Sequence, residues 1–326
     1  SALADAGLDT FLLDWRGSPW TMQRVLDGPL LAPTVAEECR AFTCDRVARE
    51  DIPAALERIR GVVGPDLPLA VLGHCTSGGT LAMAVAGGHL AGFGVSRVVH
   101  VALGLFYEVP WDGWVKVEDF ILERLLAEAP SCRAIDPRAP GLWPAVMREE
   151  ADFWPRAWLT PGDGPTLELL RRLTFMVGRA WTPERLAPGL DDGLLLGVFG
   201  PFHLGLFLHS GQLVRRGFAA PFDQADRIDR PRLRAAGQPA VAAAAGYLDA
   251  GPFAALKVTL VAAGANRVWH RDSIDLMYDW LLNADASARG DRVQKLVFPG
   301  YDLQELFWGR DAAREVYGPL TRALGG

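Results

Sequence analysis

Short apolar runs alternate with amphipathic segments near both ends of the chain. The runs are apolar throughout, which is typical of parallel strands that are covered on both faces, and the segments between them have helical spacing. This alternation predicts an α/β fold with a mostly parallel sheet. The expected strands are 9–15, 67–73, 96–105, 256–264 and 291–300, and the expected helices are 1–7, 45–64, 76–88, 272–282 and 311–324.

The middle of the chain has a different pattern. Between residues 106 and 250 we expect helices and no strand, with many Pro and Gly residues between the helical segments. The clearest helical segments are 117–129, 166–178 and 201–217. The simplest division is one α/β core, residues 1–105 and 251–326, interrupted by a helical cap or lid, residues 106–250.

The strand ending at Gly73 leads through a turn of small residues into the helix that begins near Thr76. The pattern Gly73-His-Cys75-Thr-Ser77 fits a nucleophile elbow, where the flanking residues must be small because the backbone at the nucleophile is strained. Cys75 is therefore the candidate nucleophile. The N-terminus of the helix favours its thiolate, and the backbone N–H of Thr76 is a candidate oxyanion donor. A buried structural cysteine, or Ser77 as nucleophile, are the alternatives.

Composition narrows the classes of function. The net charge is −6 and no basic stripe is present, which argues against nucleic acid as a partner. Apolar runs end well before the ~20 residues that a membrane helix needs, and no signal peptide is recognisable. Four cysteines form no disulfide framework, so we expect a cytoplasmic protein. Cys39 and Cys44 lack zinc-ligand partners at the right spacing, and we expect neither a metal nor a cofactor.

Several stretches resemble a known family. They are LADAGLDTFLLDWRGSP (3–19), DIPAALERIR (51–60), LGHCTSGGTLAMA (72–84), RRLTFMVGRAW (171–181), FLHSGQLVRRG (207–217), GANRVWHRDS (264–273) and PGYDLQELFWGRDAAREVYGPL (299–320). The chain resembles α/β-hydrolase-fold proteins associated with cholesterol-oxidase-type (GMC) flavoenzymes and, more distantly, polyhydroxyalkanoate synthases. The resemblance implies ester- or thioester-directed acyl transfer by an elbow Cys, with a late His as base and an acid after the penultimate strand.

The sequence departs from that family at the base and at the acid. Leu303 stands where the resemblance places the His, and the last His in the chain is His270. His270 follows the penultimate strand and is the leading candidate for a replacement base. Asn266 stands where an Asp is usual, with Asp272 and Asp275 further along. A thiol depends on a base less than a serine does, so the loss of the late His weakens covalent chemistry without excluding it.

The other histidines are weaker candidates for the base. His74 is adjacent to Cys75 and is expected to point away from it. His203 and His209 lie six residues apart, on different faces of one helix, and His209 is expected to be structural; His89 and His100 fit a helix end and a strand.

A further departure lies at the start of the chain, which opens on a helix where a hydrolase of this type would have earlier strands and a second oxyanion donor. Two interpretations are open: a partner chain or a separate piece supplies those strands, or the domain is built without them.

Three hypotheses follow. The first is Cys-dependent acyl transfer, or other non-hydrolytic acyl chemistry, on a hydrophobic acyl thioester or ester, with the acyl group carried on CoA or a carrier protein. The second is a catalytically degenerate hydrolase-fold protein that acts as a binding or partner subunit. The third is an esterase or thioesterase with a non-standard base. A redox-sensing cysteine has little support from the residues.

Overall fold

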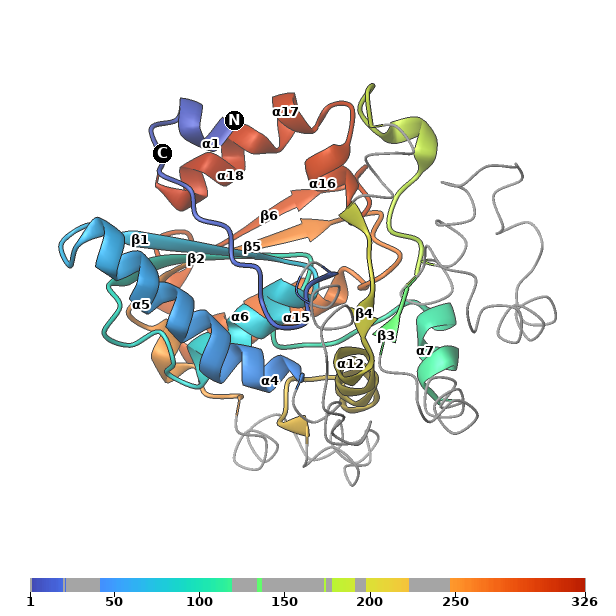
Figure 1. Cartoon of the computed structure of the whole chain (residues 1–326), viewed down its shortest axis with the longest axis horizontal. Coiled ribbons are helices and arrows are strands. Elements are labelled where there is room, and N and C mark those ends of the chain that lie inside the picture. Colours follow the sequence, from blue (N-terminus) through green and yellow to red (C-terminus); the bar gives the residue numbers. More distant parts are fainter. Residues whose placement is uncertain are drawn as a thin grey trace.

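Four parallel strands form the sheet at the centre of the molecule (Figure 1). The computed structural model describes residues 2–19, 21, 42–118, 134–136, 173, 178–190, 198–222 and 247–325. In sheet order the strands are β1 (Leu69–His74), β2 (Val95–Val101), β5 (Lys257–Ala263) and β6 (Val293–Phe298). These four strands and their parallel pairing confirm the predicted α/β fold.

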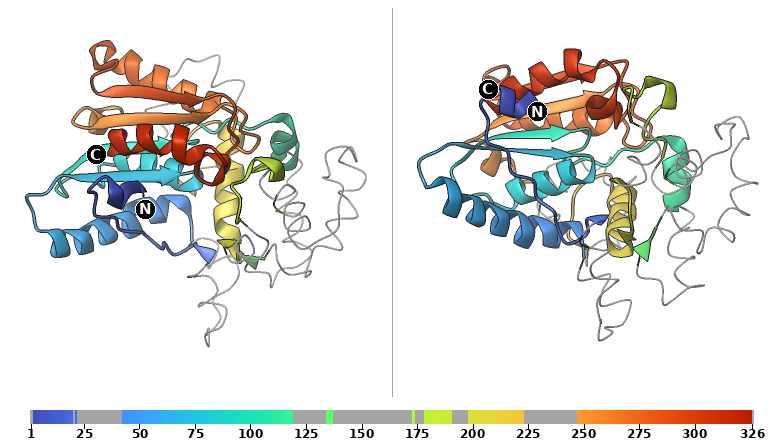
Figure 2. Two further views of the ribbon diagram at one scale, coloured as in Figure 1. Left: turned by 90° about the horizontal axis from the view of Figure 1, so that it is seen from above. Right: turned by 45° about the horizontal axis from the view of Figure 1, so that its top comes forward.

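Helices cover both faces of the sheet (Figures 1 and 2). One face carries α5 (Ile52–Val63), α6 (Thr76–Ala86) and α15 (Asp272–Ala284), and the other carries α1 (Ala2–Asp5) and α18 (Tyr317–Leu324). The shorter helical segments are α4 (Cys44–Arg46), η1 (Val47–Asp51), η5 (Gly251–Phe253), η6 (Ala286–Ala288), α16 (Glu305–Trp308) and α17 (Ala312–Glu315). None of the helices in the described part of the chain is long and apolar enough to cross a membrane.

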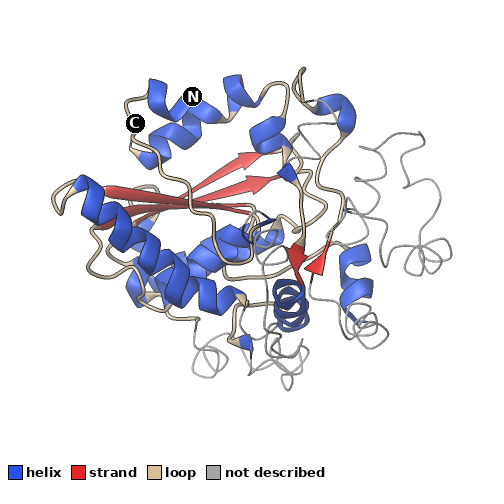
Figure 3. Ribbon diagram, in the orientation of Figure 1, coloured by secondary structure: helices blue, strands red, loops and turns tan. Residues whose placement is uncertain are grey.

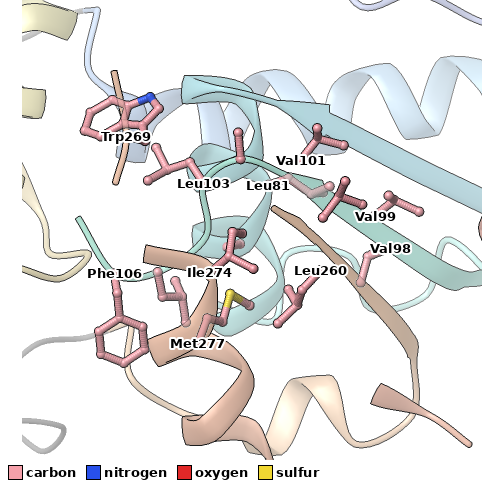
Figure 4. Close-up of a cluster of buried hydrophobic side chains, with 14 of the residues drawn as sticks. Leu81, Val98, Val99, Val101, Leu103, Phe106, Leu260, Trp269, Ile274 and Met277 are labelled. Carbon is pink, nitrogen blue, oxygen red and sulfur yellow. The ribbon is translucent and has the colours of Figure 1, made fainter. Parts of the chain in front are cut away.

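The two inner strands supply the centre of the core. Val98, Val99 and Leu260 are fully buried, because each inner strand is flanked by strands and covered by helices on both faces. Figure 4 shows these side chains in one cluster with Leu81 of α6 and Met277 of α15, with Trp269 at one end of the cluster. The core therefore extends to the carboxyl end of the sheet, where the candidate site lies.

The predicted strand at 9–15 is wrong. These residues are extended but pair with no strand in the described structure (Figure 3), and Leu12 is 94% exposed. The described sheet begins at β1, so this apolar run has no neighbouring strand to accept its backbone hydrogen bonds. An apolar pattern alone cannot supply that neighbour.

Within its described residues, the middle of the chain contributes the helices α7 (Trp111–Glu118) and α12 (Leu204–Arg216) and a small sheet beyond the carboxyl ends of the strands (Figure 1). Helix α7 packs against α12, and η3 (Pro183–Arg185) is a short 3₁₀ turn. The expectation of no strand here is wrong: β3 (Ala134–Ile135) pairs antiparallel with β4 (Phe202–His203). Strands of two residues are too short to leave an alternating pattern in the sequence.

The predicted helices at 117–129 and 166–178 lie mostly outside the described residues. The division into core and cap stays a prediction.

A close approach between α6 and the sheet yields a test of this fold. A Cβ added at Gly78 would lie 2.6 Å from the Leu103 carbonyl oxygen, whereas one added at Gly61 in α5 would meet nothing within 4 Å. We expect Gly78→Ala to lower the free energy of unfolding by about 1–3 kcal/mol through overpacking. The matched Gly61→Ala should raise it by about 0.5–1 kcal/mol through helix propensity. Urea denaturation measures both, and equal effects would contradict the predicted packing.

Candidate functional site

Cys75 occupies a strained turn between β1 and α6. Its φ is 58° and its ψ is −131°, a left-handed conformation that non-glycine residues rarely adopt. Its N–H donates to the Val101 carbonyl at 2.9 Å, and its own carbonyl accepts from Gly78 N–H at 2.8 Å. Gly73 is required because a Cβ there would clash with the Ser77 carbonyl. The backbone is therefore that of a nucleophile elbow, with Cys75 at its tip.

Two side chains contact the Cys75 sulfur at hydrogen-bonding distance. The indole Nε1–H of Trp269 donates to Sγ at 3.3 Å, and the Thr76 hydroxyl lies 3.8 Å from it. Burial raises the pKa of the Cys75 thiol above its ordinary value, although hydrogen bonds from Trp269 and from the side chain and backbone N–H of Thr76 oppose that rise. At neutral pH the group is therefore a thiol.

Thr76 opens α6 with its backbone N–H beside the sulfur. Its carbonyl accepts from the Thr80 hydroxyl at 2.8 Å, which fixes the first turn of the helix. This arrangement suits the predicted role of Thr76 as an oxyanion donor, and that role stays a prediction.

Asn266 performs a different task from the one expected of an acid. Its side-chain oxygen accepts from the backbone N–H of Val268 at 2.9 Å and of Trp269 at 3.1 Å. Such a turn around a buried Asn fixes the backbone that follows it. Asn266 thus orients Trp269, and in the described structure its side chain bonds to no histidine.

His270 is not brought to the sulfur. Its ring is half exposed, and its Nδ1 accepts from the backbone N–H of Asp272 at 3.3 Å. Its own backbone N–H donates to the Glu108 carbonyl at 2.8 Å, so the ring and backbone are both engaged elsewhere. Within the described residues, the side chains that bond to the Cys75 sulfur are those of Trp269 and Thr76.

Leu303, which stands where the resemblance places a His, packs into the interior of the protein. Leu303 is buried (2% exposed), and its carbonyl accepts from His74 Nε2–H at 3.2 Å. Asp302 anchors the same loop by accepting from the Arg267 guanidinium at 2.7 and 2.9 Å. Burial lowers the pKa of His74 to about 4, so this ring is neutral and committed to the loop.

Two further histidines also have structural partners. His209 accepts from Cys44 N–H at 3.2 Å and donates to the Ala220 carbonyl at 2.8 Å, while His203 accepts from Gly205 N–H at the start of α12. Cys44 is buried with a pKa raised to about 12 by that burial, and Cys39 lies outside the described residues. No group of three or more His, Cys, Asp or Glu side chains in the described ranges could hold a metal ion.

Trp269 is the residue that sequence reasoning missed. It lies inside GANRVWHRDS, between Asn266, the candidate for the acid, and His270, the candidate for the base. The signal available was an indole, a donor without acceptor capacity, in the loop after the penultimate strand. The site as a whole offers donors to the sulfur and no described proton acceptor beside it.

Comparison with known proteins gives distant structural likeness. Similar solved structures include a lipase in its open form, a thermostable carboxyl esterase from Bacillus coagulans and an acetylester hydrolase from Corynebacterium glutamicum. Identities are 13%, 13% and 11%, and TM-scores are 0.46, 0.44 and 0.40. The matches cover 85%, 83% and 85% of this chain and 71%, 70% and 66% of theirs.

Likeness at this level carries no argument about the chemistry of this chain. No family model matches the sequence, and no curated protein matches it significantly. The resemblance to flavoenzyme-associated proteins stays a prediction.

The state of the thiol can be tested by alkylation. Because the pKa of Cys75 is raised, its reaction with iodoacetamide should accelerate by about tenfold per pH unit from pH 7 through pH 9 without levelling. Peptide mass spectrometry follows the rate, with buried Cys44 as an internal control that reacts only on unfolding. A rate that levels off near neutral pH would show an activated thiolate instead.

The buried histidine beside the elbow makes stability depend on pH. The folded pKa of His74 is about 4 and the unfolded value is near 6.5, so the unfolded chain binds the extra proton first. The free energy of unfolding should therefore decrease as the pH is lowered from about 6.5 to 4. This group contributes up to about 1.4 kcal/mol per pH unit to that decrease. His74→Gln keeps a donor for Leu303 and should remove the share of that slope due to His74 in urea denaturation, while His100 and His203, whose pKa burial also lowers to about 4, keep theirs. An unchanged slope would contradict a neutral His74.

Proposed function

We propose that this protein performs Cys-dependent acyl transfer, with Cys75 accepting the acyl group of a hydrophobic acyl thioester. The observation that carries the proposal is the strained backbone of Cys75. A non-glycine residue held at φ 58° costs about 1–3 kcal/mol, and such strain clusters at functional sites. The strain presents the sulfur beside the N-terminus of α6, where the Thr76 N–H faces it.

The absence of a proton acceptor at the sulfur, within the described residues, favours a thioester over an oxygen ester. An alkoxide leaving group needs a general acid, whereas a leaving thiolate resembles the attacking one and needs none. The balanced exchange is Cys75–SH plus R–CO–SR′ giving Cys75–S–CO–R plus R′–SH. One C–S bond forms and one breaks, and the thiol proton ends on the leaving thiol.

The acyl group is expected to be hydrophobic and carried on CoA or a carrier protein. Cys75 packs against the hydrophobic core, so an acyl chain attached to its sulfur begins among apolar side chains. The predicted cap, residues 106–250, would cover the rest of such a chain.

Water is a poor acceptor for this acyl group. Leu303 replaces the His that would activate water, and His74 and His270 are bonded elsewhere. Transfer to a second nucleophile, a thiol or an amine, is therefore the favoured outcome over hydrolysis.

A second candidate function is binding without catalysis. The specific observation in its favour is that Trp269, Asn266 and Leu303 hold the positions around Cys75 with no described His or carboxylate on the sulfur. In that case the elbow is a retained scaffold and the protein binds an acyl carrier or a partner subunit.

Intact-mass analysis separates these functions. The protein is incubated with the octanoyl thioester of N-acetylcysteamine and with ethyl octanoate as the matched oxygen ester. We expect one octanoyl group on the Cys75 peptide from the thioester only, and none in Cys75→Ala. An unmodified Cys75 with a bound thioester would favour the binding function. Free octanoic acid without an adduct would favour an esterase or thioesterase with a non-standard base.

A further inference from the structure

The indole of Trp269 is buried against the candidate nucleophile, Cys75. Trp269 is 7% exposed and lies at one end of the core cluster (Figure 4). Its Nε1–H has one described acceptor, the Cys75 sulfur at 3.3 Å. The Tyr107 ring meets the indole edge-to-face, with centroids 5.6 Å apart and planes at 89°. A buried indole usually donates its N–H to a strong acceptor. Donation to a sulfur, which is a weak acceptor, is therefore a specific arrangement.

Three hydrogen-bonded contacts hold that indole in place. Asn266 fixes the Trp269 backbone, and the next residue, His270, donates its N–H to the Glu108 carbonyl at 2.8 Å. Ser273 donates to the same carbonyl at 3.0 Å and accepts from Glu108 N–H at 2.9 Å. The loop carrying Trp269 is thereby bound to the segment carrying Tyr107, so the donor is oriented before any substrate arrives.

The surroundings of this donor are closely packed. The Tyr107 hydroxyl is buried with no hydrogen-bond partner among the described residues, and a Cβ added at Gly79 of α6 would lie 2.5 Å from it. A hydrogen bond to a developing charge is stronger in such surroundings than in water.

Attack by Cys75 creates a negative oxygen close to these donors. The oxygen is bonded to the carbon that the sulfur attacks, so it lies within about 3 Å of the sulfur in the tetrahedral intermediate. The Trp269 Nε1–H, which already points at the sulfur, can move to that oxygen with little rearrangement, and the Thr76 N–H at the start of α6 is next to the same sulfur.

We propose that the Trp269 indole N–H is the second oxyanion donor of this site, paired with the backbone N–H of Thr76. The inference rests on the proposed acyl transfer to Cys75. In the resting protein the Trp269 N–H lies on the sulfur, and the Thr76 N–H is next to it at the start of α6. As the Cys75 sulfur bonds to the thioester carbon, the carbonyl electron pair moves to oxygen and the two donors follow. When the leaving thiolate departs, the carbonyl re-forms.

Two reactions of the same thiol distinguish this role from a merely structural one. Alkylation by iodoacetamide forms no oxyanion, whereas acylation by the octanoyl thioester does. In Trp269→Phe, both rates should fall to the extent that the thiolate is lost, but acylation should fall by about 100-fold more than alkylation at the same pH. The ratio of the two rates is therefore the readout.

Matched variants guard against a folding artefact. Trp280→Phe, which changes a partly buried indole that packs on Phe106 and Phe253, should leave the ratio unchanged. Asn266→Ala should lower the ratio because it frees the Trp269 backbone, and Asn266→Asp should restore it because a carboxylate accepts the same two N–H groups. If Trp269→Phe does not fold, benzothienylalanine at position 269 removes only the donor and keeps the bicyclic shape.

Equal falls in the two rates would overturn the inference while leaving acyl transfer intact. A wild-type protein that is alkylated but never acylated at Cys75 would overturn the proposed function itself, and this inference with it.

Discussion

The positive φ of Cys75 is the constraint on which the rest of the structure depends. Cys75 keeps a φ of 58° because the residues packed around it leave no room for another backbone conformation. Gly73 and Gly78 let α6 approach the end of β1, and the Cys75 N–H is satisfied by Val101 on the adjacent strand. The inner strands β2 and β5 are buried on both faces, and their packing supports the turn at Cys75. The strain at one residue is thus balanced by the packing of the whole sheet.

The groups around the Cys75 sulfur determine which reactions we propose for it. Trp269 and Thr76 supply donors, which favour a thiolate and an oxyanion, and neither side chain can take a proton at neutral pH. The loop after β6, which a hydrolase of the expected type would use for its base, is closed by Leu303 and fastened through Asp302 to Arg267. This arrangement is the basis for the proposal that the site receives an acyl group from a thioester more readily than it gives one to water.

The sequence alone predicts those features of the structure that depend on local residue patterns. The elbow at Gly73–Ser77 and the apolar runs of β1, β2, β5 and β6 were predictable because small residues and buried strands leave direct marks. The run at 9–15 has the same apolar mark and forms no strand, because a strand also requires a neighbour. The role of Trp269 was not predictable, since it arises where a loop after β5 crosses to the end of β1. Asn266 was found in the right loop, but its amide orients a tryptophan and not a histidine.

The lifetime of an acyl group on Cys75 tests the central claim most directly. After loading from a thioester and removal of excess donor, the mass of the protein is followed in neutral buffer. The account predicts that the octanoyl group persists for hours and leaves promptly when a small thiol is added as acceptor. An acyl group that departs into water as fast as it was loaded, with release of free octanoic acid, would contradict it.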